Sequence, residues 1–102
     1  SGGNQQKTVV AREMDREPAL LIAAQPTRGL DVGAVEFVYQ QINEHKRNGG
    51  ATLLISTELD EAFTLADRIG VMFNGRLVRI LDADEATVDE VGLLMAGEEI
   101  PA

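Results

Sequence analysis

The pattern of apolar and polar positions changes its spacing several times along the chain. Residues 19–24 (ALLIAA) and 51–56 (ATLLIS) are short runs that are apolar almost throughout. Runs of this length predict strands that are buried on both faces, as in a parallel sheet. Residues 68–73 and 76–81 also have the composition of strands, and the Asn-Gly dipeptide between them fits a type I′ turn. These last two segments are therefore expected to pair as an antiparallel hairpin.

Between the strand-like runs, apolar residues recur at the three- and four-residue spacing of one helix face. This spacing predicts four helices, and the residues that share a face are the candidates for burial. The predicted helices are about 4–16, with Lys7, Val10, Ala11 and Met14 on one face; from near Val32 to 47, with Val35, Val38, Tyr39 and Ile42; one after residue 57, with Leu59, Ala62, Phe63 and Ala66; and about 87–96.

The predicted elements alternate between helix and strand, which indicates the α/β class. Two parallel buried strands with helical crossovers are followed by an edge β-hairpin and a C-terminal helix. Two parallel strands make a thin sheet, because a parallel sheet needs both of its faces covered. We therefore expect residues 1–102 to be a single partial domain that belongs to a larger one.

The composition restricts the classes of partner. The chain of 102 residues is 44% hydrophobic and has a formal net charge of −8, with 9 basic and 17 acidic residues. Seven of the acidic residues follow Arg79 with no basic residue among them, so we expect a solvated acidic tail after a nearly neutral first part. An acidic chain with only three Phe and one Tyr is a poor candidate for binding nucleic acid.

The sequence also restricts the kinds of metal and redox site. It contains no cysteine, which excludes disulfides and cysteine-based metal sites. Its single histidine, His45, makes a histidine metal cluster untenable, and we expect this residue at the surface of its helix. No apolar run reaches the roughly 20 residues that span a bilayer.

The first candidate for chemistry is the segment SGGNQQK, residues 1–7, which leads into the first predicted helix. Two glycines allow a ligand to approach the backbone closely, and the first turn of a helix offers N–H groups with partial positive charge. This combination suits a phosphate group. The alternative interpretation is a linker remnant without function, and the segment alone does not decide between them.

Four segments in order extend the pattern. SGGNQQK followed by the strand LLIAAQP resembles the signature motif of ABC transporter ATPases followed by their Walker B strand. PTRGLDVGA (26–34) resembles the D-loop region, with Asp31 as its aspartate; LLISTELDEA (53–62) resembles the strand and switch segment; and DRIGVMFNGRLV (67–78) resembles the hairpin that follows. The resemblance covers almost the whole chain and implies a partial P-loop NTPase core.

Two carboxylates that the family carries at the end of the Walker B strand are replaced here. The resemblance places Ala24 where an aspartate helps to hold Mg²⁺, and Gln25 where a glutamate polarises the attacking water. Ala24 offers no oxygen, and Gln25 can donate or accept a hydrogen bond but cannot take a proton. The switch histidine falls at Thr57, so this site looks non-catalytic. The alternative is that Ala24 and Gln25 are ordinary strand-end residues.

Several residues also have plain structural interpretations. Asp31 can cap the helix that begins near Val32, and Thr57 with Asp60 fits a capping box. Either role is compatible with a D-loop or switch position. Arg28 can pair with a carboxylate at the surface, where such a pair contributes little free energy.

The motifs GGNQQK and PTRGLDVGA are typical of importers whose two ATPase halves are fused in one chain. The resemblance therefore implies part of the ATP-hydrolysing subunit of a bacterial importer for nucleosides or sugars, from its C-terminal half, at the cytoplasmic face of the cell membrane. Its partners would be the other ATPase half, transmembrane permease subunits and, indirectly, a periplasmic or lipoprotein solute-binding protein.

In this family the signature motif of one half closes over ATP held by the other half. The resemblance thus implies that Ser1, Gly2, Gly3 and Gln5 contact ATP bound with Mg²⁺ by the partner half. The chain lacks G-x-x-x-x-G-K-[ST], so we expect it to bind no nucleotide alone. Two alternatives are a regulatory or scaffold half with an idle signature motif and, further removed, a plain α/β interaction domain.

Overall fold

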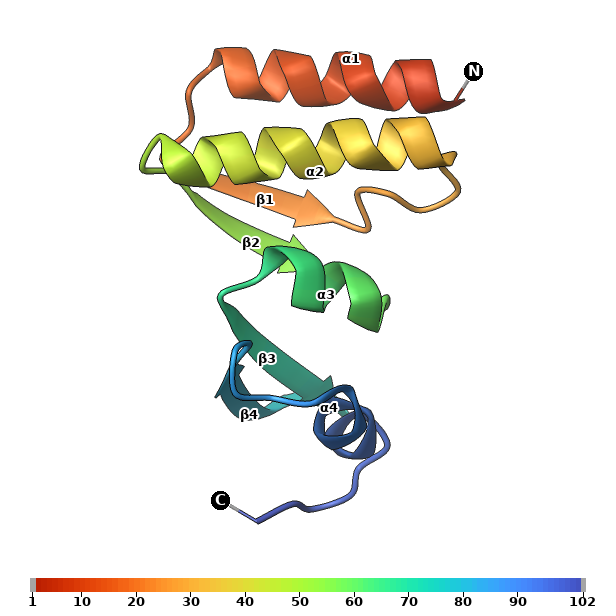
Figure 1. Ribbon diagram of the computed structural model, residues 1–102, viewed down its shortest axis with the longest axis vertical. Helices are drawn as coiled ribbons and strands as arrows, with labels where there is room; N and C mark the ends of the chain where they lie inside the picture. Colours follow the sequence, from red (N-terminus) through yellow and green to blue (C-terminus); the bar gives the residue numbers. More distant parts are fainter. Residues whose placement is uncertain (1, 102) are drawn as a thin grey trace. The chain divides into compact units, whose positions relative to one another are not determined.

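A computed structural model describes residues 2–101 and confirms the α/β class and the predicted order of elements. Contacts divide the chain into two compact units, Ser1–Thr57 and Glu58–Ala102. The elements, labelled in Figure 1, are α1 (Gly2–Asp15), β1 (Leu20–Ala24), α2 (Val32–Arg47), β2 (Ala51–Ile55), α3 (Leu59–Leu65), β3 (Arg68–Phe73), β4 (Arg76–Asp82) and α4 (Val88–Met95).

The first unit is a parallel strand pair covered by two helices. β1 and β2 pair in register from Leu20 opposite Ala51 to Ala24 opposite Ile55, and α2 forms the crossover between them. α2 lies between α1 and the strands (Figure 1), and it buries Ala34, Val38 and Ile42. A parallel pair joined by a helix is the arrangement that the alternation of apolar runs predicts.

The prediction that these strands are buried on both faces is wrong for the structure. Leu20 is 55% exposed and Ile22 is 62% exposed, while Leu21 and Ala23 on the other face of β1 are half-buried. β2 shows the same alternation, with Leu53 and Ile55 exposed. The reason is that helices cover only one face of this sheet, so every second residue of each strand faces outward.

The second unit is built around the predicted hairpin. β3 and β4 pair antiparallel, and the connecting Asn74 and Gly75 have φ angles of 51° and 74°. Positive φ at both central residues is what a type I′ turn requires, which confirms the prediction. The core of this unit is formed by Ile69, Val71, Val91 and Leu94, and the predicted helix stripe packs against it: Leu59, Ala62, Phe63 and Ala66.

Helix capping differs from the prediction in α3. The helix begins at Leu59, so its N-cap is Glu58 rather than Thr57, and the Glu58 side chain makes no capping hydrogen bond. The capping box occurs instead at α4, where Thr87 and Glu90 exchange side-chain and backbone hydrogen bonds. Thr57 is therefore one residue too early to form the predicted box with Asp60.

The buried face of α1 is rotated relative to the prediction, and the expectation that His45 lies at the surface of α2 is wrong. On α1, Gln6, Val10 and Met14 are half-buried, whereas Lys7 and Ala11 are exposed. Likewise, His45 is only 9% exposed, and its Nε2 lies 3.2 Å from the carbonyl oxygen of Ala51. His45 is buried because it continues the stripe of Val38 and Ile42 at helical spacing, and its ring packs against the start of β2.

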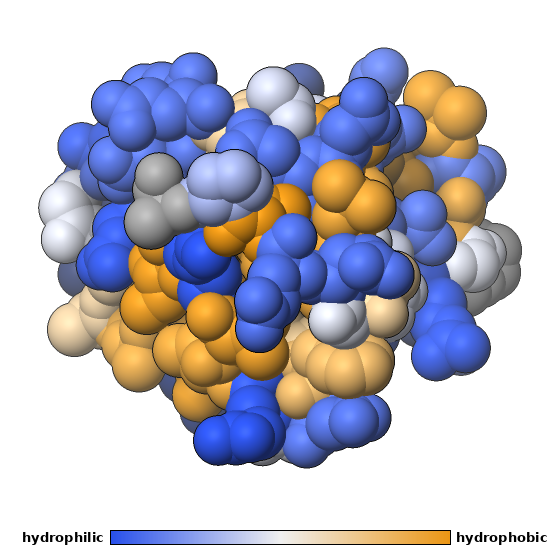
Figure 2. Space-filling model, turned by 90° about the horizontal axis from the view of Figure 1, so that it is seen from below, coloured by the Kyte–Doolittle hydropathy of each residue, from blue (hydrophilic) through white to orange (hydrophobic). Residues whose placement is uncertain are grey.

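The acidic tail is solvated as predicted. All of its seven acidic residues except Glu90 are exposed. Apolar side chains are exposed as well, and Figure 2 shows them gathered in patches on one face of the molecule. In the second unit the large exposed apolar side chains are Met72, Leu77, Val78, Ile80, Val88, Leu93 and Met95.

Candidate functional site

One edge of the first unit brings the candidate residues together. The carboxyl ends of β1 and β2 and the N-terminal ends of α1 and α2 all lie at this edge, on the right in Figure 1. Helix N-termini carry partial positive charge, and ligands of parallel α/β sheets bind beyond the carboxyl ends of the strands. We call residues 2–6, 24–31 and 57 at this edge the candidate site.

Ala24 and Gln25 stand at the end of β1, where the sequence predicted them. Ala24 pairs with Ile55, and the backbone N–H of Gln25 donates to the carbonyl oxygen of Ile55 at 2.7 Å. Gln25 has a φ of 48°, in the left-handed region that side chains other than glycine seldom adopt. The strand therefore ends abruptly at Gln25, and the chain turns there into a tight loop.

The loop after Gln25 is held by its own hydrogen bonds. The N–H of Arg28 donates to the carbonyl oxygen of Gln25 at 3.3 Å, and the N–H of Leu30 donates to that of Thr27 at 3.1 Å. The loop ends at Asp31, whose Oδ1 accepts a 2.9 Å hydrogen bond from the N–H of Ala34. Asp31 thus caps α2, which confirms the structural role predicted for it.

The glycine segment begins α1. The helix starts at Gly2, two residues earlier than predicted, so Gly2 and Gly3 lie in its first turn. Gln5 in the same turn is exposed, and Ser1 lies outside the described residues. Because a helix leaves the N–H groups of its first turn without intrahelical acceptors, this end of α1 can donate hydrogen bonds to an anion.

Sequence reasoning missed Gln6, which joins the two segments of the candidate site. Its side-chain Nε2 donates a 2.7 Å hydrogen bond to the carbonyl oxygen of Pro26. The first turn of α1 is thereby fixed beside the loop that follows Gln25. The available signal was the position of Gln6, which stands four residues before Val10 on the half-buried face of α1.

Thr57 lies at the same edge, two residues after the end of β2, and its side chain is exposed. Arg28 in the neighbouring loop is also exposed, and it makes no ion pair within residues 2–101, so the predicted surface pair is not formed. The candidate site therefore presents backbone N–H groups, side-chain amides, two threonine hydroxyls, one arginine and the carboxylate of Asp31, which caps α2.

The residues at the end of β1 do not fit a metal ion. Mg²⁺ prefers oxygen ligands, with carboxylates first among them, and the side chain of Ala24 has no oxygen. Asp31 is the carboxylate nearest along the chain, and it uses one oxygen to cap α2. Across residues 2–101 no group of three His, Cys, Asp or Glu side chains could hold a metal.

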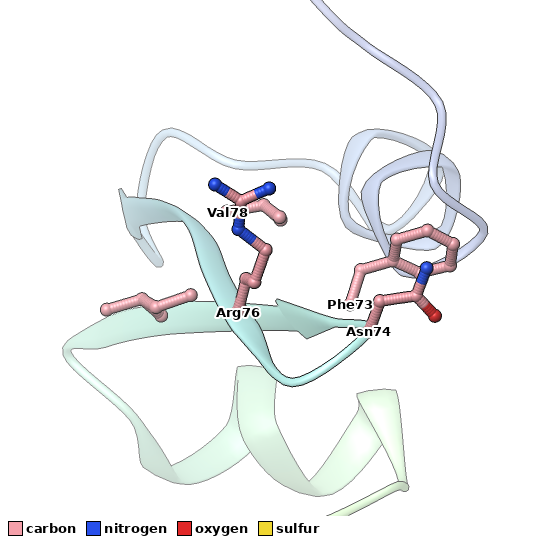
Figure 3. A pocket seen from close by; sticks show the side chains of 5 residues that line it. Phe73, Asn74, Arg76 and Val78 are labelled. Atoms are coloured by element: carbon pink, nitrogen blue, oxygen red, sulfur yellow. The ribbon is translucent and has the colours of Figure 1, made fainter.

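A cavity of about 440 Å³ lies in the second unit and contains none of these residues. It is lined by Phe73, Asn74, Arg76, Leu77 and Val78 around the hairpin turn (Figure 3). No carboxylate, histidine or helix N-terminus lines it, so it offers no arrangement for catalysis. Likewise, the described helices include none that is both long and apolar enough to cross a bilayer.

Comparison with known proteins gives matches over nearly the whole chain. No protein-family model matches it. The chain is 58% identical over 97 residues to a guanosine import ATP-binding protein (NupO) of Bacillus subtilis, and 49% identical over 100 residues to a nucleoside import ATP-binding protein (NupA) of Lactococcus lactis. These matches cover 95% and 98% of the chain but only 19% and 20% of the relatives, so the chain spans about one fifth of their length.

Matches also extend to sugar import and to solved structures. A ribose import ATP-binding protein (RbsA) of Halalkalibacterium halodurans is 45% identical over 89% of the chain, and the match covers 18% of that protein. A nucleotide-free ATP-binding cassette from an ABC transporter superposes with a TM-score of 0.70 at 28% identity, covering 78% of this chain and 32% of that one. The dimeric cassette MJ0796 bound to ADP and Pi gives a TM-score of 0.71 at 26% identity, covering 81% and 36%.

Proposed function

Because this chain is a homologue of the ATP-binding proteins of sugar and nucleoside importers and has the fold of part of an ABC ATPase cassette, we propose that it is a segment of the ATP-binding subunit of a bacterial ABC importer. Nucleosides are favoured over sugars as the class of solute. The support for this choice is the higher identity to the guanosine and nucleoside relatives, at 58% and 49%, than to the ribose relative, at 45%.

The two ATP sites of this importer are proposed to be unequal. One observation supports this proposal. The start of α1, which contains Gly2 and Gly3, lies at the same sheet edge as the end of β1, where Ala24 and Gln25 provide no carboxylate. The first feature serves an ATP site on the partner half, and the second belongs to the segment's own half. One ATP site is then productive and the other is not.

At the productive site this segment acts by positioning. Ser1, Gly2, Gly3 and Gln5 close over ATP held by the partner half, with the first-turn N–H groups of α1 directed at phosphate oxygens. Bound ATP supplies the phosphoryl group that is transferred to water. Fixed N–H donors stabilise negative charge without reorganising, so their loss lowers the rate of hydrolysis.

At the other site, three side chains that act in ATP hydrolysis in this family are replaced, by Ala24, Gln25 and Thr57. Ala24 provides no ligand for Mg²⁺, Gln25 takes no proton, and Thr57 does not provide the switch imidazole. We propose that this site binds nucleotide without useful turnover in the whole subunit. The segment alone, which lacks a phosphate-binding G-x-x-x-x-G-K-[ST] loop, binds none.

The partners follow from the same proposal. They are the other ATPase half, the transmembrane permease subunits on which an importer ATPase docks at the cytoplasmic face of the membrane, and indirectly a solute-binding protein. The dimeric arrangement of the MJ0796 cassette supports pairing of two ATPase halves.

The test is Gly2→Asp in the full-length subunit assembled with its permease in lipid. The change places bulk and negative charge at the first turn of α1, so we expect near-complete loss of ATP hydrolysis. Gly92→Asp is the matched control, because Gly92 is also a helical glycine, has open space around it and lies in the second unit. An unchanged rate in Gly2→Asp would instead support a scaffold half with an idle signature motif.

A further inference from the structure

Pro26 has a backbone carbonyl that requires a donor. Pro26 is a buried residue and the hydrogen bond that its carbonyl oxygen accepts is partly buried, so losing that bond costs free energy. The hydrogen bond that reaches this oxygen comes from Nε2 of Gln6, twenty residues earlier in the chain, at 2.7 Å. The bond is therefore a long-range tie between α1 and the loop that leads to α2.

The loop that receives this bond is held in an unfavourable backbone conformation. Gln25 immediately precedes Pro26 and has a φ of 48°, so the loop starts from a residue in the left-handed region. Within the loop, the hydrogen bond from Arg28 to Gln25 is long, at 3.3 Å. Such a conformation persists only when surrounding contacts enforce it, and the bond from Gln6 is one of these contacts.

A glutamine at position 6 suits a hydrogen bond to the loop better than it suits hydrophobic packing. Val10 and Met14 continue the same half-buried face of α1, so packing alone would place an apolar side chain there. The neighbouring Gln5 has the same side chain but is exposed. Of the two adjacent glutamines, only Gln6 directs its amide at the loop.

We propose that Gln6 is a positioning residue that makes the first turn of α1 and the loop of residues 25–31 move as one body. The inference rests on the proposed function, because that function requires both segments to meet the partner half together. Gly2, Gly3 and Gln5 lie at one end of the tie, and Asp31 ends the loop at the other. Gln6 itself need not touch ATP.

The experiment uses the full-length subunit with its permease in lipid and the variants Gln6→Glu and Gln6→Ala. Glutamate has the same shape but no hydrogen-bond donor, so it removes the bond while keeping the size of the side chain. Gln40→Glu and Gln40→Ala are the matched controls, because Gln40 lies exposed on α2. The readouts are amide hydrogen exchange of the peptide spanning residues 26–31 and the kcat and KM for ATP.

We expect exchange of the 26–31 peptide, which contains the Arg28 and Leu30 amides, to be about fivefold faster in both Gln6 variants, as the loss of one hydrogen bond predicts. We expect kcat to fall by about the same factor with KM unchanged, because the partner half's phosphate loop holds the ATP. The Gln40 variants should alter neither readout.

Unchanged exchange in Gln6→Glu would overturn the proposal, and so would faster exchange with kcat unchanged. Failure of the proposed function is read separately, from the rate of Gly2→Asp. If Gly2→Asp hydrolyses ATP normally, the unequal-site proposal fails, while the exchange data still report whether Gln6 holds the loop.

Discussion

At the scale of single residues, Ala24 and Gln25 keep the backbone pairing of a strand end, and what distinguishes them is the chemistry of their side chains. Ala24 keeps its place in the parallel ladder opposite Ile55, and Gln25 donates its N–H to the same residue. The end of the strand is therefore regular up to Ala24, and under the proposed function only the carboxylate groups would be missing from it. A neutral amide can orient a water molecule, but it cannot act as a base.

Restoring one of these groups is predicted to be insufficient. Gln25→Glu in the assembled importer should leave the ATP hydrolysis rate unchanged, because Ala24 still provides no ligand for Mg²⁺. The measurement is steady-state hydrolysis together with single-turnover counting of the ATP cleaved per subunit. A second ATP cleaved per subunit by the Gln25→Glu variant would contradict the unequal-site proposal.

At the scale of elements, local sequence patterns were sufficient to predict the type and order of the helices and strands. All eight elements occur in the predicted order, because strand runs, helix spacing and the Asn74-Gly75 turn are properties of adjacent residues. Three of the wrong predictions concern which side of an element faces inward. The burial of His45, the exposed face of β1 and the rotated face of α1 are set by neighbours that are distant in sequence.

The candidate site likewise contains features that the sequence could predict and one that it could not. The positions of Ala24 and Gln25 at a strand end, and of Asp31 at a helix start, could be predicted from motifs and capping chemistry. The hydrogen bond from Gln6 to Pro26 could not be predicted, because every residue has a backbone carbonyl and the sequence does not indicate which one accepts a side-chain donor. Thr57 was placed correctly after β2 but was given the wrong cap, since α3 starts one residue later than the box requires.

The start of α2 gives a prediction for one element. Asp31→Ala removes the side-chain oxygen that accepts from Ala34 N–H and should lower the free energy of unfolding by about 1 kcal/mol. Asp31→Asn should lower it by much less, because asparagine is an equally good N-cap. Urea unfolding of the chain, followed by circular dichroism, measures both. Equal loss in the two variants would mean that the carboxylate charge, rather than the cap, stabilises α2.

At the scale of the whole molecule, each sheet has only two strands and leaves apolar side chains exposed. On the outer face of the first sheet these are Leu20, Ile22, Leu53 and Ile55, all about half exposed or more. Isolated two-stranded sheets are marginally stable, and exposed apolar faces with unpaired strand edges promote association.

The isolated chain is therefore expected to self-associate as its concentration rises. Replacing two neighbours on the outer face, Ile22→Thr with Leu53→Thr, should shift the distribution toward monomer in sedimentation velocity. Val9→Thr with Val88→Thr is the control, because it removes exposed apolar surface from two helices and leaves the outer face of this sheet intact. If the control pair shifts the distribution equally, general hydrophobicity rather than this sheet face drives association.

The bond from Gln6 to Pro26 has a consequence for variation among related sequences. Its acceptor is a main-chain oxygen, and every amino acid supplies one, so no substitution at position 26 can compensate for the loss of the glutamine amide. Positions 6 and 26 should therefore show no correlated substitution. Methods that infer contacts from covariation in sequence alignments would not detect the contact between Gln6 and Pro26. A suppressor of Gln6→Ala should arise instead on another element, as a new donor that reaches the same oxygen.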